Sequence, residues 1–254
     1  MVDPKQQLAE SGILLVDKPE DWTSHDVVNF VRRRFRVRKV GHCGSLDPIA
    51  TGLLVLVLGR ATKIAARLTA QDKVYAGTMR LGVETFTQDR AGEVLATADT
   101  SAITPEDVRR VCAGFVGEIE QVPPMVSAIK KDGKPLYKLA RKGEVVEREP
   151  RPVTIHSLTL GAIEIPDVVF ETHCSKGTYV RTLCSDIGAQ LGCGAHLLGL
   201  RRLRSGPFEI EQAYTIDAMR DWDRDRLLQE MIPLSQVLLL LMDLSAQAAV
   251  QAKR

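Results

Sequence analysis

The feature that most constrains this fold is the run Leu53–Leu58, six consecutive apolar residues that read L-L-V-L-V-L. A short run of this kind predicts a strand that is buried on both faces. It directly follows G-H-C-G-S-L-D-P-I-A-T-G at residues 41–52. Gly41 and Gly44 permit backbone angles that other residues avoid, and Pro48 biases Asp47 toward an extended conformation. The pattern therefore predicts a carboxylate, Asp47, on a stiff loop beside a buried strand.

Two interpretations of Asp47 are open from this local pattern. Functional residues are frequently carried by loops that a rigid scaffold positions, and His42 and Ser45 are close in sequence. Aspartate is also common as a residue that caps a turn, with no functional role. The local pattern alone does not decide between the two.

The charge of the chain is localised rather than large. With 254 residues and 44% apolar residues, the chain can build one large core or two modest ones. The net charge is only +2, but basic residues gather in three segments. These are residues 32–39, residues 130–142 and residues 201–204. Each segment alone could be a solvated face, whereas three in a near-neutral chain indicate localised phosphate contacts.

Cysteine usage favours a reducing compartment. The chain has five cysteines, an odd number, and no C-x-x-C pair, which argues against a disulfide framework or a zinc site of thiolates. The first residues contain no apolar signal segment, and the late apolar run Val237–Met242 is too short to cross a bilayer. We expect a cytoplasmic protein that makes no contact with a membrane.

Helices and strands are expected to alternate irregularly, which predicts a mixed α/β fold (α+β mixed) with a mixed, largely antiparallel sheet. Ser24 can cap a helix, and Thr104 can cap another. Residues 75–82 and 168–174 alternate as strands do, and Lys176–Thr178 predicts a turn that leads into a helix. Residues 124–151 show no periodicity and are expected to form an inserted, partly mobile loop.

Residues 41–52 resemble the G-H-x-G-x-L-D-P-x-A-[ST]-G signature of bacterial tRNA pseudouridine-55 synthases of the TruB type. Further segments resemble this family in the same order along the chain: D-K-P-E-D-W-T-S (17–24), K-V-Y-A (73–76), T-F-T-Q-D-R-A-G (85–92), P-P-M-V-S-A (123–128), S-K-G-T-Y-V-R-T-L (175–183) and G-C-G-A-H-L-L-G-L-R-R-L (192–203). The resemblance covers residues 12–206. The family usually has glycine at Asp21, and threonine at Cys43 and Ser45.

The resemblance implies the pseudouridine-synthase fold and a domain order. Residues 10–182 would form the catalytic core, with the basic loop 124–151 inserted, and residues 183–240 the C-terminal part of the catalytic domain. Residues 241–254 resemble the start of an RNA-binding PUA domain. We expect no complete PUA domain, either because it is naturally absent or because the sequence is truncated.

The resemblance also implies an activity: conversion of uridine-55 in the TΨC arm of tRNA to pseudouridine. Substrate and product are isomers, so the reaction calls for no metal, redox group or other cofactor, and the sequence contains no P-loop, no G-x-G-x-x-G and no metal-ligand cluster. Asp47 would act as the nucleophile on an extruded uridine. Whether it attacks C1′ or C6, or removes a sugar proton, is open.

The resemblance assigns roles to further residues, each beside a structural alternative. Arg181 would pair with Asp47, although it could be a surface arginine of a helix. Tyr75 would contact the base and relay a proton, or else simply pack in the core. The resemblance also implies that His42, Tyr179, Leu200 and Lys18 bind the nucleotide, where Lys18 would lie at the pocket floor or be a solvated strand-end lysine. From the basic clusters, we expect Lys130 and Arg202 to contact the RNA backbone. The expected partner is tRNA, without an obligate protein partner, and the protein would be a monomer.

Two alternatives remain beside the stand-alone enzyme. The chain could be the catalytic subunit of a guide-RNA-dependent pseudouridine synthase, which its short length disfavours. It could also be a tRNA-binding or tRNA-folding protein with incidental catalysis, although binding alone would not require Asp47.

Overall fold

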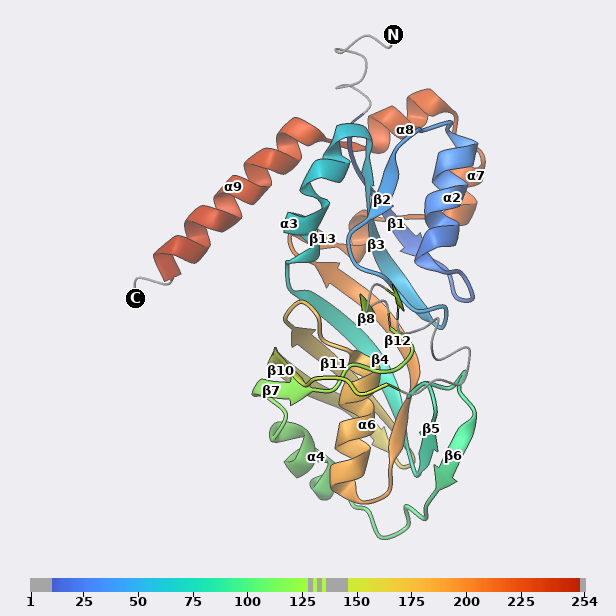
Figure 1. The fold of residues 1–254 in the computed structure, drawn as a ribbon, viewed down its shortest axis with the longest axis vertical. Helices are drawn as coiled ribbons and strands as arrows, with labels where there is room; N and C mark the ends of the chain where they lie inside the picture. The colour runs from blue at the N-terminus through green and yellow to red at the C-terminus, as the bar shows by residue number, and fades with distance from the viewer. Residues whose placement is uncertain (1–10, 128–129, 132–133, 136–145, 252–254) are drawn as a thin grey trace. The chain divides into compact units, whose positions relative to one another are not determined.

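The computed structural model describes residues 11–127, 130–131, 134–135 and 146–251, with side chains described up to residue 243 and not for residues 130–135 (Figure 1). The chain forms two compact units. The first comprises Met1–Gln71 and Arg202–Arg254, and the second comprises Asp72–Arg201. The chain therefore passes between the units just before strand β4 and again within strand β12 (Ala195–Ser205).

The central strand of the first unit is β3 (Ala50–Leu58). All of its residues are buried except Thr51, which is partly exposed. β3 pairs antiparallel with β1 (Gly12–Lys18), with Lys18 opposite Gly52, and with β2 (Val40–His42). The remaining elements of this unit are α2 (Ser24–Arg34), η1 (Gly59–Ile64), α3 (Ala65–Thr69), β13 (Phe208–Glu209), η2 (Ile210–Gln212), β14 (Tyr214–Thr215), α7 (Ile216–Arg220), α8 (Arg224–Glu230), β15 (Ile232–Pro233) and α9 (Leu234–Gln251).

The apolar run that the sequence analysis singled out forms the core of this unit, as predicted. Leu53, Val55 and Val57 pack with side chains of β1 and with Phe208 and Val237. Burial of such a strand on both faces removes several large apolar side chains from water, each contributing about 1.5–3 kcal/mol. The position of β3 is therefore strongly determined, and so is the loop that precedes it.

The residue that caps helix α2 lies one position earlier than predicted. Thr23, not Ser24, is the N-cap: its side chain accepts from the Asp26 backbone N–H, and the Asp26 carboxylate accepts from the Thr23 backbone N–H. This reciprocal arrangement satisfies two backbone donors that the helix leaves free. Ser24 consequently has its hydroxyl available for a different contact, described below.

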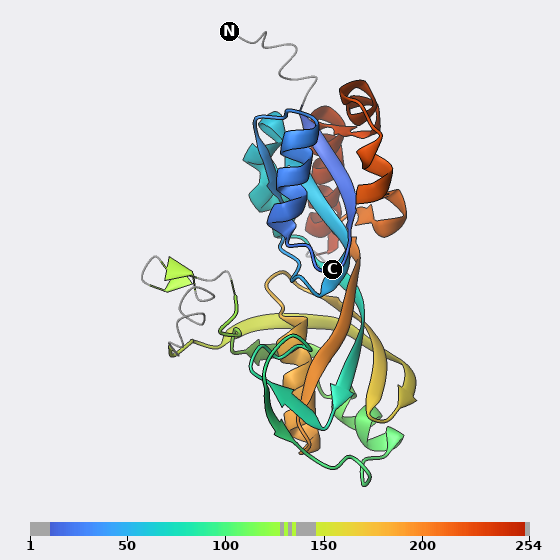
Figure 2. The same cartoon turned by 90° about the vertical axis from the view of Figure 1, so that its right-hand side faces the viewer.

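The second unit has the strand order β4-β11-β10-β7, and all these pairs are antiparallel. Its elements are β4 (Lys73–Leu81), β5 (Val83–Thr85), β6 (Val94–Thr97), α4 (Pro105–Ala113), β7 (Gly117–Gln121), β8 (Lys130–Lys131), β9 (Lys134–Pro135), β10 (Arg151–Glu164), β11 (Asp167–Cys174) and α6 (Val180–Leu191). Figure 2 shows β10 and β11 as a long, curved pair of strands. The predicted strands and the helices after Thr104 and after the 176–178 turn are confirmed.

The mixed α/β fold with a largely antiparallel sheet is confirmed; β1 and β14 form a parallel pair. Much of the expected loop 124–151 lies outside the described residues. Within the part of the chain that the structure describes, no helix is both long and apolar enough to cross a membrane.

Candidate active site

Asp47 lies in the loop between β2 and β3, in the first unit. The two strands pair with His42 opposite Leu56, and the Cys43 N–H continues the pairing by donating to the Val55 carbonyl at 2.9 Å. β3 begins at Ala50, six residues before Leu56, so residues 43–49 connect two strands of unequal length. The side chain of Asp47 is partly exposed, which leaves a carboxylate accessible from outside.

The backbone of this loop is held at almost every residue. Ser24 Oγ accepts from the Leu46 N–H at 2.8 Å and donates to the Leu46 carbonyl at 3.2 Å. The Asp47 carbonyl accepts from the Ala50 N–H at 3.0 Å, and the Pro48 carbonyl accepts from the Asp21 N–H at 2.9 Å. Because the residues on both sides of Asp47 are fixed in this way, its carboxylate has little freedom to move. The role of Ser24 was missed in the sequence, where it resembled an ordinary helix cap.

Lys18 supports the loop from the end of β1. It is fully buried, and its Nζ donates to the carbonyls of Pro19 at 2.8 Å and Trp22 at 2.6 Å, with a long contact of 3.4 Å to the Pro48 carbonyl. Burial lowers the pKa of Lys18 to about 8, and the negative charge of Asp47 opposes this decrease most strongly. The interpretation of Lys18 as a solvated strand-end lysine is therefore wrong. Its ammonium group is a buried cation that attracts Asp47.

Arg202 supports the same loop from the other side of β3. Its side chain is only 1% exposed, and its Nε donates to the Leu53 carbonyl at 2.6 Å. Nη2 donates to the Gly44 carbonyl at 3.1 Å, and Nη1 approaches the Ser45 carbonyl at 3.5 Å. A buried guanidinium that donates to backbone carbonyls is not placed to contact a phosphate. This geometry differs from the RNA contact expected from the basic cluster and supports a positioning role instead.

Glycine occupies the positions of this loop where the backbone demands it. Gly44 and Gly52 have φ of 100° and 96°, in the region that favours glycine, whereas Gly41 lies in strand β2. Asp21, at a position where the resembling family usually has glycine, has φ of 64°. Aspartate tolerates this left-handed conformation better than most residues. The departure therefore keeps the turn that presents the Asp21 N–H to Pro48.

His42 is half-buried on β2, and its Nδ1 is buried without a hydrogen-bond partner among the described residues. Burial lowers its pKa, and the positive charges of Arg202 and His25 lower it further. The ring is therefore neutral at physiological pH. One nitrogen of a neutral imidazole donates and the other accepts, so His42 offers a polar atom that no other residue in the described part of the chain satisfies.

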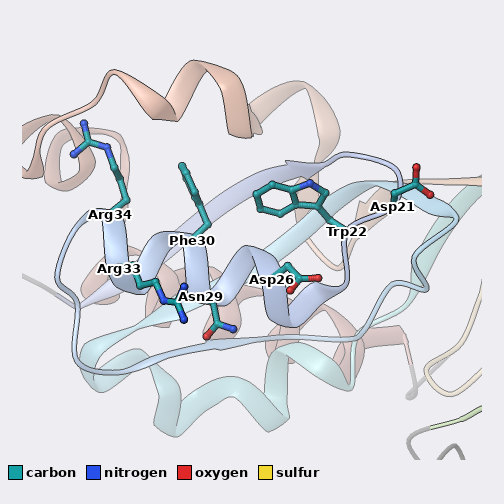
Figure 3. A pocket seen from close by; sticks show the side chains of 7 residues that line it. All are labelled: Asp21, Trp22, Asp26, Asn29, Phe30, Arg33 and Arg34. Carbon is teal, nitrogen blue, oxygen red and sulfur yellow. The ribbon is translucent and has the colours of Figure 1, made fainter.

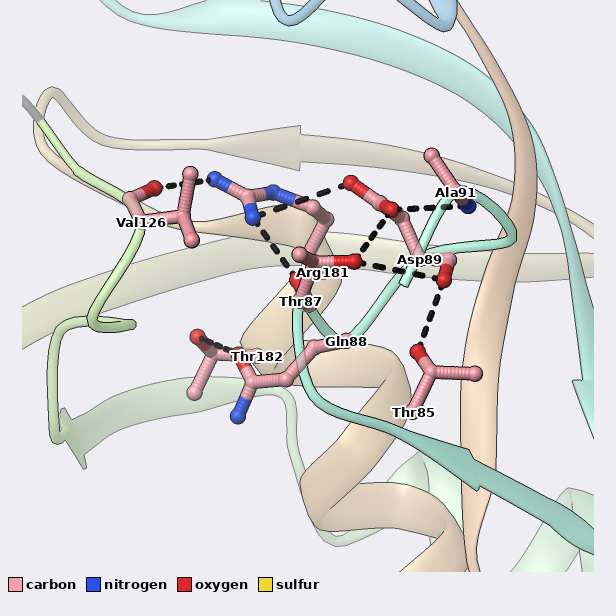
Figure 4. A network of polar contacts seen from close by, with 8 residues as sticks. All are labelled: Thr85, Thr87, Gln88, Asp89, Ala91, Val126, Arg181 and Thr182. Atoms are coloured by element: carbon pink, nitrogen blue, oxygen red, sulfur yellow. Dashed lines mark hydrogen bonds and ion pairs between the residues drawn. The ribbon is translucent and has the colours of Figure 1, made fainter. Parts of the chain in front are cut away.

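Arg181 belongs to the second unit, in the first turn of α6, and is buried. Figure 4 shows its guanidinium donating to the carbonyls of Thr87 at 2.7 Å and Val126 at 2.8 Å, with Asp89 Oδ2 at 3.7 Å from Nη1. The interpretation as a surface arginine is wrong. Asp47 belongs to the first unit, so the expected pairing of Arg181 with Asp47 stays a prediction.

Asp89 organises the segment that receives Arg181. Its carboxylate accepts from Thr87 Oγ1 at 2.6 Å and from the Ala91 N–H at 3.0 Å, and its carbonyl accepts from Thr85 Oγ1 at 2.7 Å (Figure 4). Asp89 is 5% exposed, so this network is shielded from water. Sequence reasoning gave no role to Asp89, although it lies in the T-F-T-Q-D-R-A-G segment.

The other predicted site residues of the second unit have defined positions. Tyr75 is 8% exposed on β4, opposite Thr172 of β11. Tyr179 precedes α6, where Gln121 binds its backbone through both amide atoms, at 3.0 and 3.2 Å. Leu200 is half-buried on β12. Lys130 is in β8, but its side chain lies outside the described part, and the roles of all four residues stay predictions.

A pocket of about 780 Å³ lies beside α2 and is lined by Asp21, Trp22, Asp26, Asn29, Phe30, Arg33 and Arg34 (Figure 3). The rings of Trp22 and Phe30 meet edge to face, with centroids 6.2 Å apart. Two acidic and two basic side chains balance the charge of the lining. The pocket therefore does not select for an anion on electrostatic grounds.

Comparisons with known proteins give a consistent result. Residues 32–180 match the model of the TruB family pseudouridylate synthase N-terminal domain. Residues 181–239 match the model of the tRNA pseudouridylate synthase B C-terminal domain.

Among curated relatives, tRNA pseudouridine synthase B of Syntrophotalea carbinolica is 55% identical over 86% of this chain and 72% of its own length. The protein of the same name from Opitutus terrae is 48% identical over 93% of this chain and 97% of its own length. Among solved structures, a Cbf5-Nop10-Gar1 complex contains a chain that is 31% identical, with a TM-score of 0.67. That match covers 87% of this chain and 56% of the other.

Proposed function

Because this chain belongs to the TruB family of pseudouridine synthases, we propose that it isomerises uridine-55 in the T arm of tRNA, with Asp47 as the catalytic nucleophile. The enzyme class, an isomerase, follows from the family. The position of the uridine, the recognition of the T arm and the role of Asp47 are our proposal.

The observation that carries the proposal is the immobilised loop around Asp47. Hydrogen bonds hold the backbone at Leu46, Asp47 and Pro48, and the Lys18 ammonium attracts the carboxylate. An attacking group must be held within a small distance of its target, because a misplacement of about 1 Å can reduce the rate about 10²-fold. If Asp47 only capped a turn, its loop would not need support from two buried cations, Lys18 and Arg202.

The chemistry begins with the carboxylate of Asp47. A carboxylate can form a covalent bond with the ribose or base, which stores the uridine while the glycosidic bond is broken and the base turns. The attraction of Lys18 stabilises a negative charge at Asp47 before the attack. The C1′–N1 bond breaks, a C1′–C5 bond forms and the carboxylate is expelled, while the proton lost from C5 is matched by one gained at N1. Asp47 therefore returns to its starting state, and no cofactor is consumed.

Other residues support the proposal in auxiliary roles. His42 is neutral and has an unsatisfied ring nitrogen, which suits a hydrogen bond to the extruded nucleotide. Tyr75 would present its ring to the uracil, Arg181 would face the acid, and Tyr179 and Leu200 would form pocket walls. Lys130 stays a candidate for a phosphate contact. We assign Arg202 to positioning of the loop.

Identity favours a stand-alone tRNA enzyme over a guide-RNA-dependent subunit. The relatives named tRNA pseudouridine synthase B are about 50% identical to this chain, whereas the Cbf5 complexes reach 31% and 27%. We therefore propose that the protein acts as a monomer on tRNA without a guide RNA. A cytoplasmic location, expected from the cysteines, remains part of this proposal.

The test is mapping of pseudouridine in an unmodified tRNA transcript after incubation with the purified protein alone. Pseudouridine should form at position 55, and also in an isolated T-arm hairpin. Asp47→Asn should abolish formation while the Kd for tRNA changes less than threefold, because the shape of the side chain is retained. Asp217→Asn, a change of an exposed aspartate, is the matched control and should have full activity.

Three outcomes would contradict parts of the proposal. Turnover by Asp47→Asn would remove the nucleophile assignment. Modification at another position would remove the T-arm assignment. A requirement for an added guide RNA would favour the alternative, in which the chain is a catalytic subunit of a larger complex.

A further inference from the structure

A cluster of two histidines and an aspartate lies in the second unit, outside the site described above. His156 Nε2 is 3.1 Å from Asp72 Oδ2, and His173 Nε2 is 3.7 Å from the same oxygen. One ligand atom from each of the three residues lies within 4.8 Å of the others. All three side chains remain between 31% and 46% exposed, so an ion from solvent can reach them.

The strand register explains why these side chains meet. His173 of β11 pairs with Val74 of β4, and Asp72 lies two residues before Val74, on the same face by the alternation of a strand. Ile155 of β10 pairs with Cys174 and Ser157 pairs with His173, so His156 is the additional residue of a β-bulge. A bulge changes which face the following residues occupy.

The bulge also changes the burial pattern of β10. Before it, Val153 and Ile155 are buried, whereas after it Leu158 and Leu160 are the less exposed residues. An uninterrupted strand would keep one alternation throughout. Alternation from the pair Ile155–Cys174 already places His156 on the face that carries His173, and the bulge leaves His156 next to Ser157, the partner of His173. Three segments that are far apart in sequence therefore contribute one ligand atom each.

The distances suit a tetrahedral metal site. With bonds of about 2.0–2.2 Å to imidazole nitrogen and carboxylate oxygen, neighbouring ligand atoms of a zinc site lie about 3.3 Å apart. The observed 3.1 and 3.7 Å lie on either side of this value. Two imidazoles with one carboxylate are a ligand set that first-row divalent metals bind, and Zn²⁺ binds such a set without any redox chemistry.

We infer that Asp72, His156 and His173 form a binding site for a divalent transition-metal ion, with Zn²⁺ as the probe and water as the fourth ligand. The ion would clamp the start of β4 to β11 and to the bulge of β10. It would not serve the isomerisation, because Tyr75 lies on the buried face of β4, opposite to the face that Val74 and the cluster occupy. The alternative is a plain ion pair in which the Asp72 carboxylate bridges two imidazoles.

The experiment is titration of the metal-free protein with Zn²⁺, followed by thermal unfolding. One equivalent should bind with a Kd in the micromolar range. Zn²⁺ at a hundredfold excess over this Kd should raise the Tm by about 5 °C. The variants His156→Gln, His173→Gln and Asp72→Asn should each weaken binding at least tenfold. His25→Gln, a change of an exposed histidine of the first unit, is the matched control and should bind as the wild type does.

Spectroscopy with Co²⁺ identifies the ligand type. The five cysteines are free and buried, and burial raises the pKa of Cys112 and Cys174 to about 11, so thiolate ligation is not expected. A Co²⁺ spectrum without a thiolate charge-transfer band supports the site. Failure to saturate at one equivalent, a thiolate band, or unchanged binding in the His156 and His173 variants would overturn it.

Discussion

Replacement of Arg202 by methionine tests whether this arginine positions the Asp47 loop or binds RNA. Methionine keeps a similar length and suits a buried position, but it removes the hydrogen bonds to the Leu53 and Gly44 carbonyls at 2.6 and 3.1 Å. The third contact, at 3.5 Å to Ser45, is too long to contribute much. The two short bonds are therefore the ones whose loss the variant measures.

The magnitude follows from these two bonds. A hydrogen bond that involves a charged group contributes about 1.5–3 kcal/mol, and the loss leaves carbonyls without their donors. Removal of a buried cation offsets part of this loss, because a charge is costly to take out of water. We expect the free energy of unfolding to decrease by about 2–4 kcal/mol. The turnover number should decrease about 10- to 100-fold, since a small displacement of a catalytic group has an effect of this size.

The assays are urea unfolding, single-turnover formation of pseudouridine, and the Kd for tRNA measured against salt concentration. Because Arg202 is buried, the salt dependence of tRNA binding should match that of the wild type. Arg204→Met is the matched control: it makes the same change of charge on the same strand, at a residue that is partly exposed. Arg204→Met should change the free energy of unfolding by less than about 0.5 kcal/mol.

Two results would refute this reasoning. If Arg202 contacts a phosphate, the slope of log Kd against log salt becomes shallower by about 0.7–0.9 in Arg202→Met, while stability is retained. If the loop does not depend on Arg202, stability and turnover both stay at the wild-type level. Either result would remove the positioning role, and the first would also restore the interpretation of residues 201–204 as an RNA-binding cluster.

Three further predictions concern Lys18, Asp186 and Asp21. Burial lowers the pKa of Lys18 to about 8, so its positive charge is present below that pH and lost above it. The value of kcat/KM should therefore decrease as pH rises through about 8, whereas Lys18→Met should be slower and should not show this decrease. Burial raises the pKa of Asp186 from 3.8 to about 6, so its ionisation destabilises the fold as pH rises through this window. Asp186→Asn should therefore stabilise the protein at pH 7 but not at pH 4. The pKa shift corresponds to about 3 kcal/mol at most, and solvent screening reduces the expected gain to about 1 kcal/mol. Equal effects at both pH values, measured by urea unfolding, would contradict this. Asp21→Gly should relieve the backbone strain at φ of 64° and increase the free energy of unfolding by about 0.5–1 kcal/mol, with activity retained. A decrease of more than about 1 kcal/mol would show that the Asp21 side chain has another role.

Local patterns determined much of this fold from the sequence. The run Leu53–Leu58 predicted a strand buried on both faces because no polar residue interrupts it, and all six residues are buried in β3. Thr104 with Asp107 predicted the start of α4, since a capping box involves residues only three apart. Both predictions depend on neighbours in sequence. The glycines and proline around Asp47 likewise predicted a stiff loop, whereas the interpretation of Asp47 as the candidate acid came from the resemblance to the TruB family.

The tertiary structure decided what surrounds that acid. Ser24 and Thr23 are both good capping residues, and only the packing of α2 against the loop determines that Ser24 binds Leu46. Lys18 was expected either at the pocket floor or as a solvated lysine, and Arg202 as an RNA contact, yet both are buried and donate to backbone carbonyls. Basic residues have the same sequence pattern in either setting. Their environment depends on strand pairing between segments up to about 150 residues apart, which sequence periodicity does not encode.

The cluster of Asp72, His156 and His173 shows the same division. Its residues are widely separated in sequence, and no pattern within a single segment brings them together. Alternation from the pair Ile155–Cys174 places His156 on the face of His173, and this pairing, like the bulge that follows it, is a property of two strands together. The sequence thus determined which segments become strands and where the candidate acid lies, because these depend on local patterns. Which cations lie beneath that acid, and which side chains share a face, depended on long-range pairing and was decided only by the tertiary structure.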